Sequence, residues 1–398
     1  MSNINTPPPR SRVARRIRAA AAAITVGLAA GALTVTPASA ADNAYIGQAP
    51  EGMTMSLYDY TVVKEGAADD AATNTCYACL TEGINSSADS GGHLLKFMYN
   101  KPDAEIASKA TGRLKTIMDS QLNSYTPVVG GYKFTAGAKT DGGYPIVAIP
   151  GSTLTESTRY LFDDSTQTGK KIVDKNVAPS MFDYDTKTGV YTFNSRSMVS
   201  EYNPSLHRME TWHEPGTVTS SSMWNFFPFD HQSKMNDTEN KNHYFGVKFT
   251  SPIITSADNT DGHGGHLKFY FSGDDDLWLV VDNVLVATVS GSLNRLGMTV
   301  DFTDGTISQQ SGWDSNANKP IMETSTIKAR FNVANATPDG GFNGNTFAPN
   351  TKHTMQVFYL ERGNYASNLN LQTNLITRYP LHYDLKGGNG KGPNQVQN

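Results

Sequence analysis

The sequence predicts a mainly β, antiparallel protein with one inserted helix, and two observations support the β assignment. β-branched and aromatic residues gather in short segments separated by Gly, Asn and Asp, a pattern typical of strands and turns. The clearest segments are "MTMSLYDYTVV", "GVYTFNS", "HYFGVKFTSPI", "HLKFYF", "LWLVVDNVLVATV" and "HTMQVFYLER". Both faces of "LWLVV" are apolar, so we expect this strand to be covered by a second sheet on one side and by loops or a helix on the other. One inserted stretch, residues 102–122, has helical spacing instead.

The first 40 residues have the features of a signal peptide. Five arginines precede an apolar run, and Ala38-Ser39-Ala40 forms a small-residue cleavage site. A membrane anchor is the alternative, but the apolar run is short and the cleavage site follows it at once. We therefore expect a secreted or cell-surface protein. The Arg15-Arg16 pair leaves a twin-arginine export route open.

The cysteine content is low, with Cys76 and Cys79 in "NTCYACL". A redox-active C-x-x-C would require a βαβ context, which the surrounding sequence lacks. Two thiols cannot complete a structural zinc site without histidines at ligand spacing. In an oxidising exterior we expect a small disulfide loop between the two residues.

A helix is predicted over residues 102–122, with Asn100 as the N-cap and Pro102 in the first turn. The apolar residues that recur at near-helical intervals are Ile106, Ala110, Leu114, Ile117 and Leu122. We expect this helix to pack on a sheet. The tail over residues 381–398 is rich in Gly and Asn, and we expect it to be flexible.

Two hairpins and one aromatic loop are predicted further along the chain. Gly189 closes the turn of "FDYDTKTGVYTF", and Asp282-Asn283 makes the tight turn after "LWLVV". Aromatic side chains in the loop that follows residue 215 could stack on sugars, but insertion into the core is the interpretation that we favour. These side chains are Trp224, Phe226, Phe227 and Phe229.

Three consecutive carboxylates, Asp274, Asp275 and Asp276, stand at the mouth of the apolar strand. Like charges about 4 Å apart repel by roughly 4 kcal/mol near a protein surface. Either water screens them in an exposed turn, or a cation lies among them. Calcium is the cation that oxygen ligands of this kind favour. Adjacent side chains of a regular strand point to opposite faces, so sharing one ion would require a bulge or a cis peptide.

The strand "SNLNLQTNL" alternates strictly between apolar and amide side chains. Asn368, Asn370 and Gln372 lie on its amide face and are candidate ligand-binding residues, since amides bind sugar hydroxyls or complete a calcium shell. A solvent-facing edge is the alternative. Just upstream, Glu361-Arg362 is expected to form a structural ion pair or to cap the end of a strand. In "HGGH", His263 and His266 could bind a transition metal, although a flexible Gly-rich loop is favoured.

The acidic motif also carries a family resemblance. "FSGDDDLWLVVDNVLV" with "HTMQVFYLERGNYASNLNLQTNL" resembles the fibro-slime domain of bacterial surface proteins, which is similar to the lectin-like β-sandwich of anthrax protective antigen. Looser matches extend the resemblance over residues 53–376, which implies one sandwich domain with insertions over residues 41–380. In sugar-binding relatives two adjacent aspartates hold calcium, and the ion binds sugar hydroxyls. By motif position these are Asp274 and Asp275.

Asp276 stands where the wider superfamily often has glycine. The chain departs from the fibro-slime pattern itself in two places. Asn283 replaces a turn glycine, a change that Asn tolerates because it can adopt positive φ. The segment after the hairpin is "TVSGSLNRLG" rather than a Gly-rich, His-containing loop, so the resemblance assigns no ligand group there.

Composition and the absence of catalytic motifs argue against several classes of function. The chain is 18% charged with a net charge of −4, and removal of the basic leader makes it more acidic, which argues against nucleic acid as a partner. G-x-S-x-G, H-E-x-x-H and P-loop motifs are absent, and adjacent aspartates suit a glycoside hydrolase poorly. The expected function is non-enzymatic: calcium-dependent binding of glycan or cell-surface carbohydrate in adhesion. The alternatives are a structural spacer or tip domain and, less favoured, a glycoside hydrolase.

Overall fold

The computed structural model describes residues 47–60, 93–97, 138–149, 151–165, 169–213, 226–229, 242–291, 295–314, 316–362 and 367–375. All of them belong to one compact unit, Asn43–Asn398. The signal peptide, the helix over residues 102–122, the cysteine pair and the C-terminal tail were predicted in segments that lie outside the described residues.

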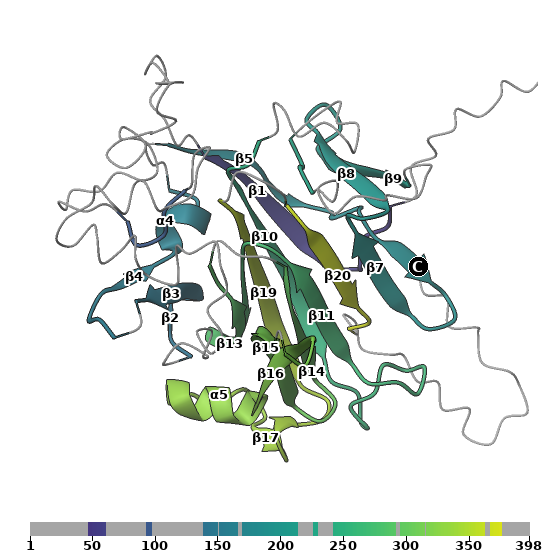
Figure 1. The fold of residues 1–398 in the computed structure, drawn as a ribbon. Helices are drawn as coiled ribbons and strands as arrows, with labels where there is room; N and C mark the ends of the chain where they lie inside the picture. Colours follow the sequence, from purple (N-terminus) through teal and green to yellow (C-terminus); the bar gives the residue numbers. More distant parts are fainter. Residues whose placement is uncertain are drawn as a thin grey trace, which may run out of the picture. The chain divides into compact units, whose positions relative to one another are not determined.

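The described chain is mainly β, as predicted, and its largest sheets are antiparallel. The first has six strands in the order β13-β12-β19-β10-β1-β5. Their bounds are β1 (Thr54–Tyr60), β5 (Lys170–Val177), β10 (Phe245–Ile254), β12 (Asp276–Val281), β13 (Val284–Val289) and β19 (Lys352–Glu361). Figure 1 shows β1, β10 and β19 side by side within this sheet.

The second large sheet has seven strands in the order β16-β15-β14-β11-β20-β7-β6. Their bounds are β6 (Asp183–Asp185), β7 (Val190–Asn194), β11 (Lys268–Gly273), β14 (Leu296–Asp301), β15 (Thr306–Asp314), β16 (Lys319–Thr326) and β20 (Leu369–Thr373). Smaller elements surround the two sheets. They are β2 (Thr140–Asp141), β3 (Tyr144–Ala148), β4 (Thr155–Ser157), α4 (Arg159–Phe162), β8 (Met198–Asn203), β9 (Arg208–His213), α5 (Ile327–Ala334), β17 (Phe342–Asn343) and β18 (Thr346–Phe347).

The two large sheets pack face to face around one hydrophobic core, which we call the main core. Phe269 and Phe271 of β11 point into it from one sheet, and Leu277 and Leu279 of β12 point into it from the other. This arrangement is a β-sandwich, so the predicted fold class is confirmed. Because side chains alternate along a strand, each sheet has an inner face on this core and an outward face.

A second cluster, the outer core, covers the outward face of the six-stranded sheet. Trp278 and Val280 of β12 lie in it together with Phe358, Leu161 and Phe162. Both faces of β12 are therefore buried, as its apolar sequence predicts. In Figure 1, α4 and the small sheet β2–β4 lie on the side of the six-stranded sheet away from β7 and β20.

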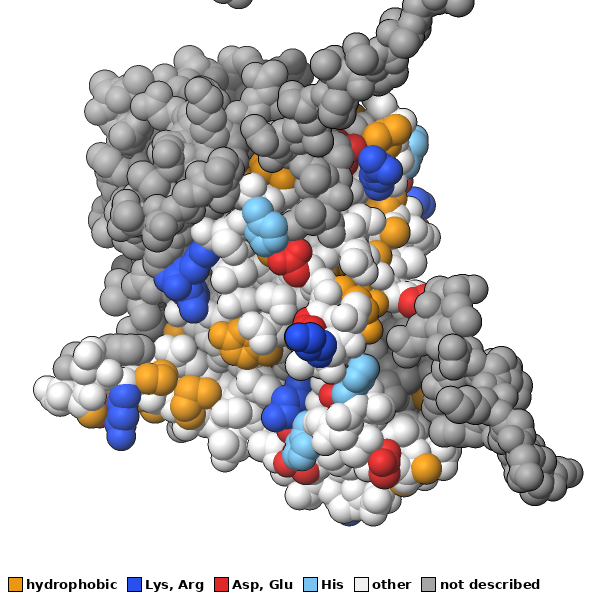
Figure 2. Space-filling model, turned by 90° about the vertical axis from the view of Figure 1, so that its right-hand side faces the viewer, with side chains coloured by type: hydrophobic (Ala, Val, Ile, Leu, Met, Phe, Trp, Pro, Cys, Tyr) orange, Lys and Arg blue, Asp and Glu red, His pale blue; other side chains and the backbone are white. Residues whose placement is uncertain are grey.

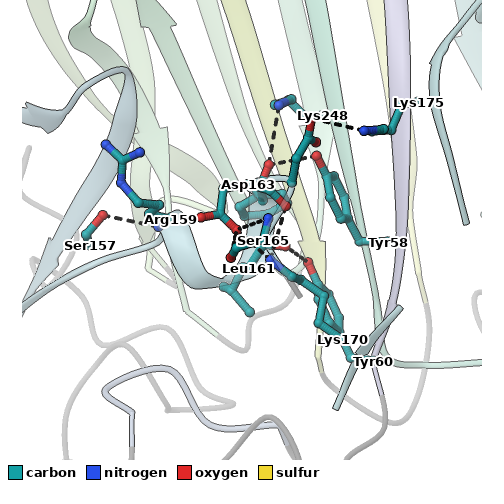
Figure 3. Close-up of polar contacts among 12 residues, drawn as sticks. Tyr58, Tyr60, Ser157, Arg159, Leu161, Asp163, Ser165, Lys170, Lys175 and Lys248 are labelled. Atoms are coloured by element: carbon teal, nitrogen blue, oxygen red, sulfur yellow. Dashed lines mark hydrogen bonds and ion pairs between the residues drawn. The ribbon is translucent and has the colours of Figure 1, made fainter. Parts of the chain in front are cut away.

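Polar contacts hold α4 on this surface (Figure 3). The Tyr58 hydroxyl donates to the carbonyl of Phe162 at 2.7 Å, and the Tyr60 hydroxyl donates to that of Leu161 at 3.0 Å. Lys170 Nζ donates to the Asp163 carboxylate at 2.7 Å. These donors satisfy carbonyl and carboxylate groups at the end of the helix, where carbonyls lack partners within the helix.

Local predictions about turns and loops are also confirmed. Asp282 and Asn283 both have positive φ in the tight β12–β13 turn, and Gly189 has positive φ in the β6–β7 turn. Phe226 and Phe227 lie buried in the main core, so this part of the aromatic loop fills the interior. Among the described residues, no helix is both long enough and apolar enough to cross a membrane.

Candidate functional site

The candidate site lies where β11 ends, β12 begins and β20 begins. Gly273 is paired with Leu369 across the β11–β20 ladder. A Cβ atom on Gly273 would lie 2.2 Å from the carbonyl oxygen of Asn368. Only glycine permits this approach, which brings the start of β20 against the acidic triplet.

Asp274 is bound directly to β20. Its Oδ1 accepts a hydrogen bond from the backbone N–H of Asn368 at 2.5 Å, and its Oδ2 accepts one from Asn368 Nδ2 at 2.6 Å. Burial and, next, the charge of Asp275 raise the pKa of Asp274 well above its usual value. Two adjacent carboxylates with so little access to water form a site that favours a bound cation.

The backbone departs from a regular strand at this point, because the Asp274-Asp275 peptide bond is cis. Asp275 is 4% exposed, and its Oδ2 accepts a hydrogen bond from the backbone N–H of Arg362 at 3.2 Å. Asp274 and Asp275 therefore both lie buried at the same strand end. These are the two aspartates that the family resemblance implied as calcium ligands.

Asp276 has a different role from the one predicted for it. Its Oδ2 lies 2.5 Å from Arg362 Nε, and both side chains are fully buried. Its Oδ1 accepts hydrogen bonds from Gly291 N–H at 2.7 Å and from Arg362 Nη2 at 3.3 Å. The guanidinium of Arg362 compensates the charge of Asp276, so we remove Asp276 from the predicted ligand set. The donors to the Asp274 oxygens are, by contrast, neutral amide groups of Asn368. The ion pair expected at Glu361-Arg362 is formed by Arg362 with Asp276.

Two amide oxygens beside the aspartates lack hydrogen-bond partners among the described residues. They are Oδ1 of Asn368 and Oδ1 of Asn370, and both atoms are buried. A buried acceptor without a donor is costly, and such groups normally have a partner. The carboxylates of Asp274 and Asp275 together with Asn368 Oδ1 form an oxygen-only donor set of the kind calcium takes. The residues present therefore fit the ion.

The other predicted ligand-binding residues lie on the outward face of the seven-stranded sheet. Leu369 and Leu371 point into the main core, so Asn370 and Gln372 point outward, as the alternation predicts. Gln372 is exposed, and Asn370 is half-buried between Ser272 of β11 and Asn194 of β7. The sequence analysis missed Arg295, whose Nε donates to Ser272 Oγ at 2.7 Å. No local motif marks it, because its place depends on pairing between β11 and β14.

Of the two histidines considered as transition-metal ligands, only His266 lies beside acidic side chains that could share a metal ion. His266 lies near Asp301 and Asp304, and their potential ligand atoms lie within 4.8 Å of one another. Asp301 Oδ2 is already 2.7 Å from His266 Nδ1 and 3.3 Å from Lys268 Nζ. The ammonium group of Lys268 thus provides the charge partner that a metal would otherwise supply. His263 is not part of this group.

On the molecular face drawn in Figure 2, acidic, basic and histidine side chains are interspersed over the described residues. Hydrophobic side chains form only small separate groups there. The described part of this face therefore carries charged groups interspersed with small apolar groups.

The chain is similar to known proteins over only part of its length. No family model matches the chain. Three proteins of Dictyostelium discoideum are similar over part of the sequence: protein psiH (25% identity over 56% of this chain and 29% of that protein), protein psiD (37% over 22% and 18%) and protein psiB (28% over 42% and 30%). The chain thus spans less than a third of the length of each of these relatives.

Among solved structures, the CBM2 module of the evolved Dit protein of Lactobacillus casei BL23 phage J-1 aligns with 49% of this chain and 94% of that module. The sequence identity is 10% and the TM-score is 0.19. At this level of similarity we base no argument on it.

Proposed function

We propose that the chain is an exported, non-catalytic binding module of the fibro-slime type that recognises carbohydrate through a bound calcium ion. Asp274, Asp275 and Asn368 would hold the ion. When bound, the ion would supply a Lewis-acidic centre that accepts sugar hydroxyl oxygens. The observation that carries the proposal is the unpartnered, buried Oδ1 of Asn368 beside two buried carboxylates.

Charge supports a cation at this position. Burial disfavours ionised carboxylates unless an opposite charge compensates them. Arg362 compensates Asp276, with which it forms the buried ion pair. The raised pKa of Asp274 reflects the remaining burial and the repulsion from Asp275. A divalent cation would relieve both effects.

A binding role also fits the surroundings better than hydrolysis. Glycoside hydrolases need two carboxyl groups about 5–10 Å apart on opposite sides of a bond. Asp274 and Asp275 are instead consecutive and meet the same strand end, where Asn368 joins them. The amides of Asn370 and Gln372 continue from this point across the outward sheet face, where they could accept and donate hydrogen bonds to sugar hydroxyls.

Calorimetric titration with calcium tests the metal site. We expect the wild-type protein to give a saturable heat, and Asp275→Asn and Asn368→Ala to lose it. Asp258→Asn is the matched control, because Asp258 is an exposed carboxylate whose hydrogen bonds are made within its own turn, to Ser256 and Thr260. A heat that is unchanged in Asp275→Asn removes the metal site from the proposal.

A glycan array with and without a chelator then tests the ligand. Binding that the chelator abolishes supports calcium-dependent recognition. If the protein binds no glycan in either condition, the carbohydrate assignment fails and a structural role as a spacer or tip domain replaces it.

A further inference from the structure

Arg295 is placed beside the candidate calcium site by the pairing of β11 with β14. Gly273 is paired with Leu296, and Asp274 and Arg295 are the residues next to this pair on the two strands. Leu296 points into the main core, and side chains alternate along a strand, so Arg295 belongs to the outward face of the sheet. Asn368, which binds the Asp274 carboxylate, is on the same face.

The guanidinium group of Arg295 is held in place by a neighbour on β11. Its Nε donates a hydrogen bond to Ser272 Oγ at 2.7 Å, and Ser272 is only 4% exposed. Ser272 is two residues before Asp274 and is therefore on the same side of the strand. The hydrogen bond thus fixes a positive charge on the sheet face that carries the Asp274 carboxylate.

The charge of Arg295 acts on the site without a direct contact. Among the described residues Arg295 is in no ion pair, in contrast to Arg362, which lies 2.5 Å from Asp276. Burial and, next, the charge of Asp275 raise the pKa of Asp274, and the charge of Arg295 acts in the opposite direction. Arg295 therefore compensates part of the negative charge of the site while leaving the carboxylate oxygens to other partners.

We propose that Arg295 is a built-in counter-charge that sets the calcium affinity of the site. In the calcium-free protein its positive charge offsets part of the repulsion between Asp274 and Asp275. When calcium binds, the same charge repels the ion, so the site binds calcium more weakly than its oxygen ligands alone would. Extracellular calcium modules have dissociation constants of about 10⁻⁴–10⁻³ M, and we expect the site in this weak range. The inference rests on the proposed function and names the residue that regulates the same site.

A series of charges at this position tests the inference by calorimetric titration with calcium chloride. Arg295→Gln removes the charge and should lower the calcium dissociation constant by about 10-fold, because a unit positive charge repels a nearby divalent cation. Arg295→Glu replaces repulsion by attraction and should lower the constant further. Arg295→Lys keeps the charge and should bind calcium within about 3-fold of the wild type.

Stability in the absence of calcium gives a second readout. In urea with a chelator, Arg295→Gln should unfold at a lower urea concentration than the wild type, because the two carboxylates lose their counter-charge. In saturating calcium this difference should shrink, because the variant binds the ion more tightly. Arg208→Gln is the matched control: it removes the charge of an exposed arginine of β9 whose partner is Glu210, and it should leave the calcium dissociation constant unchanged.

The outcomes separate the two proposals. A calcium dissociation constant that is equal or higher in Arg295→Gln than in the wild type overturns the role of Arg295 and leaves the proposed calcium site standing. Arg295→Met, which keeps an apolar stem without the charge, replaces Arg295→Gln if that variant does not fold. A calcium heat that appears only in the uncharged variants supports both proposals. Absence of a saturable heat in the wild type and in every variant overturns the proposed function, and the inference with it.

Discussion

Asp274, Asp275 and Asp276 are consecutive, yet their surroundings give them different chemistry. Asp276 starts β12, where both faces of the strand are buried, and its charge is compensated by Arg362. Asp274 is held by two donors from Asn368, which are neutral. The triplet is thus one structural carboxylate, Asp276, preceded in the chain by the two carboxylates that we propose as calcium ligands.

This difference predicts that the two substitutions change the stability of the calcium-free protein by unequal amounts. Asp276→Asn leaves the Arg362 guanidinium buried without its counter-charge, so we expect the free energy of unfolding to fall by about 3–5 kcal/mol. Asp275→Asn removes one of two repelling carboxylates, and we expect a change of less than about 1 kcal/mol. Urea denaturation in the presence of a chelator measures both. Equal losses in the two variants would contradict the division of roles.

Sequence reasoning named the residues of the candidate site but could not assign each of them its role. The motif marks Asp274 and Asp275, and the alternation of β20 marks Asn370 and Gln372, because both are local patterns. The partner of Asp276 is 86 residues away. Such a pairing depends on the register between β12 and β19, which no local pattern specifies.

At the scale of the element, the short helices show what local patterns miss. The sequence analysis did not predict α5, although Thr326 caps its N-terminus by accepting a hydrogen bond from Ala329 N–H and Asn335 ends it at φ 55°. Ile327, Arg330 and Phe331 are its buried residues, at helical spacing. Eight residues between strands give too short a pattern to stand out. The strands that were predicted, such as β12 and β19, each have several alternating or fully apolar positions.

The C-terminal end of α4, beside the outer core, leads to a prediction about how the free energy of unfolding depends on pH. Burial raises the pKa of Asp163, but hydrogen bonds from Lys170 and Ser165 lower it by more, so its net pKa lies below the usual value. The ionised carboxylate therefore stabilises the fold above the unfolded pKa of about 4, and this contribution is lost as pH falls through the folded pKa. Asp163→Asn should lower the free energy of unfolding by about 1–2 kcal/mol at pH 7.

Urea denaturation at pH 7 and at pH 3 measures the effect, and the difference between wild type and Asp163→Asn should shrink at the lower pH. Asp164→Asn is the control, because the neighbouring Asp164 is 61% exposed and pairs with Lys175 on the surface. Its effect should be close to zero at both pH values. A difference that stays constant between the two pH values would show that Asp163 does not contribute through its charge.

At the scale of the molecule, β12 connects the two cores. It is an inner strand of the six-stranded sheet, between β13 and β19, and it contributes Leu279 to the main core and Val280 to the outer core. The candidate site lies immediately before its first residue, Asp276. Packing on both faces should therefore hold the acidic strand end in place as a single rigid unit, since close-packed interiors transmit local changes.

We therefore expect substitutions on either face of β12 to destabilise the whole described sandwich. Leu279→Ala should lower the free energy of unfolding by about 2–5 kcal/mol, and Val280→Ala by about 1–3 kcal/mol. Val333→Ala, at a 52% exposed position of α5, is the matched control and should change it by less than about 0.5 kcal/mol. Hydrogen exchange should show faster opening of both β3, in the outer layer, and β11, in the opposite sheet, for each β12 variant. If Val280→Ala accelerated exchange in β3 alone, the outer layer would be an independent folding unit, and the acidic strand end would depend on the main core only.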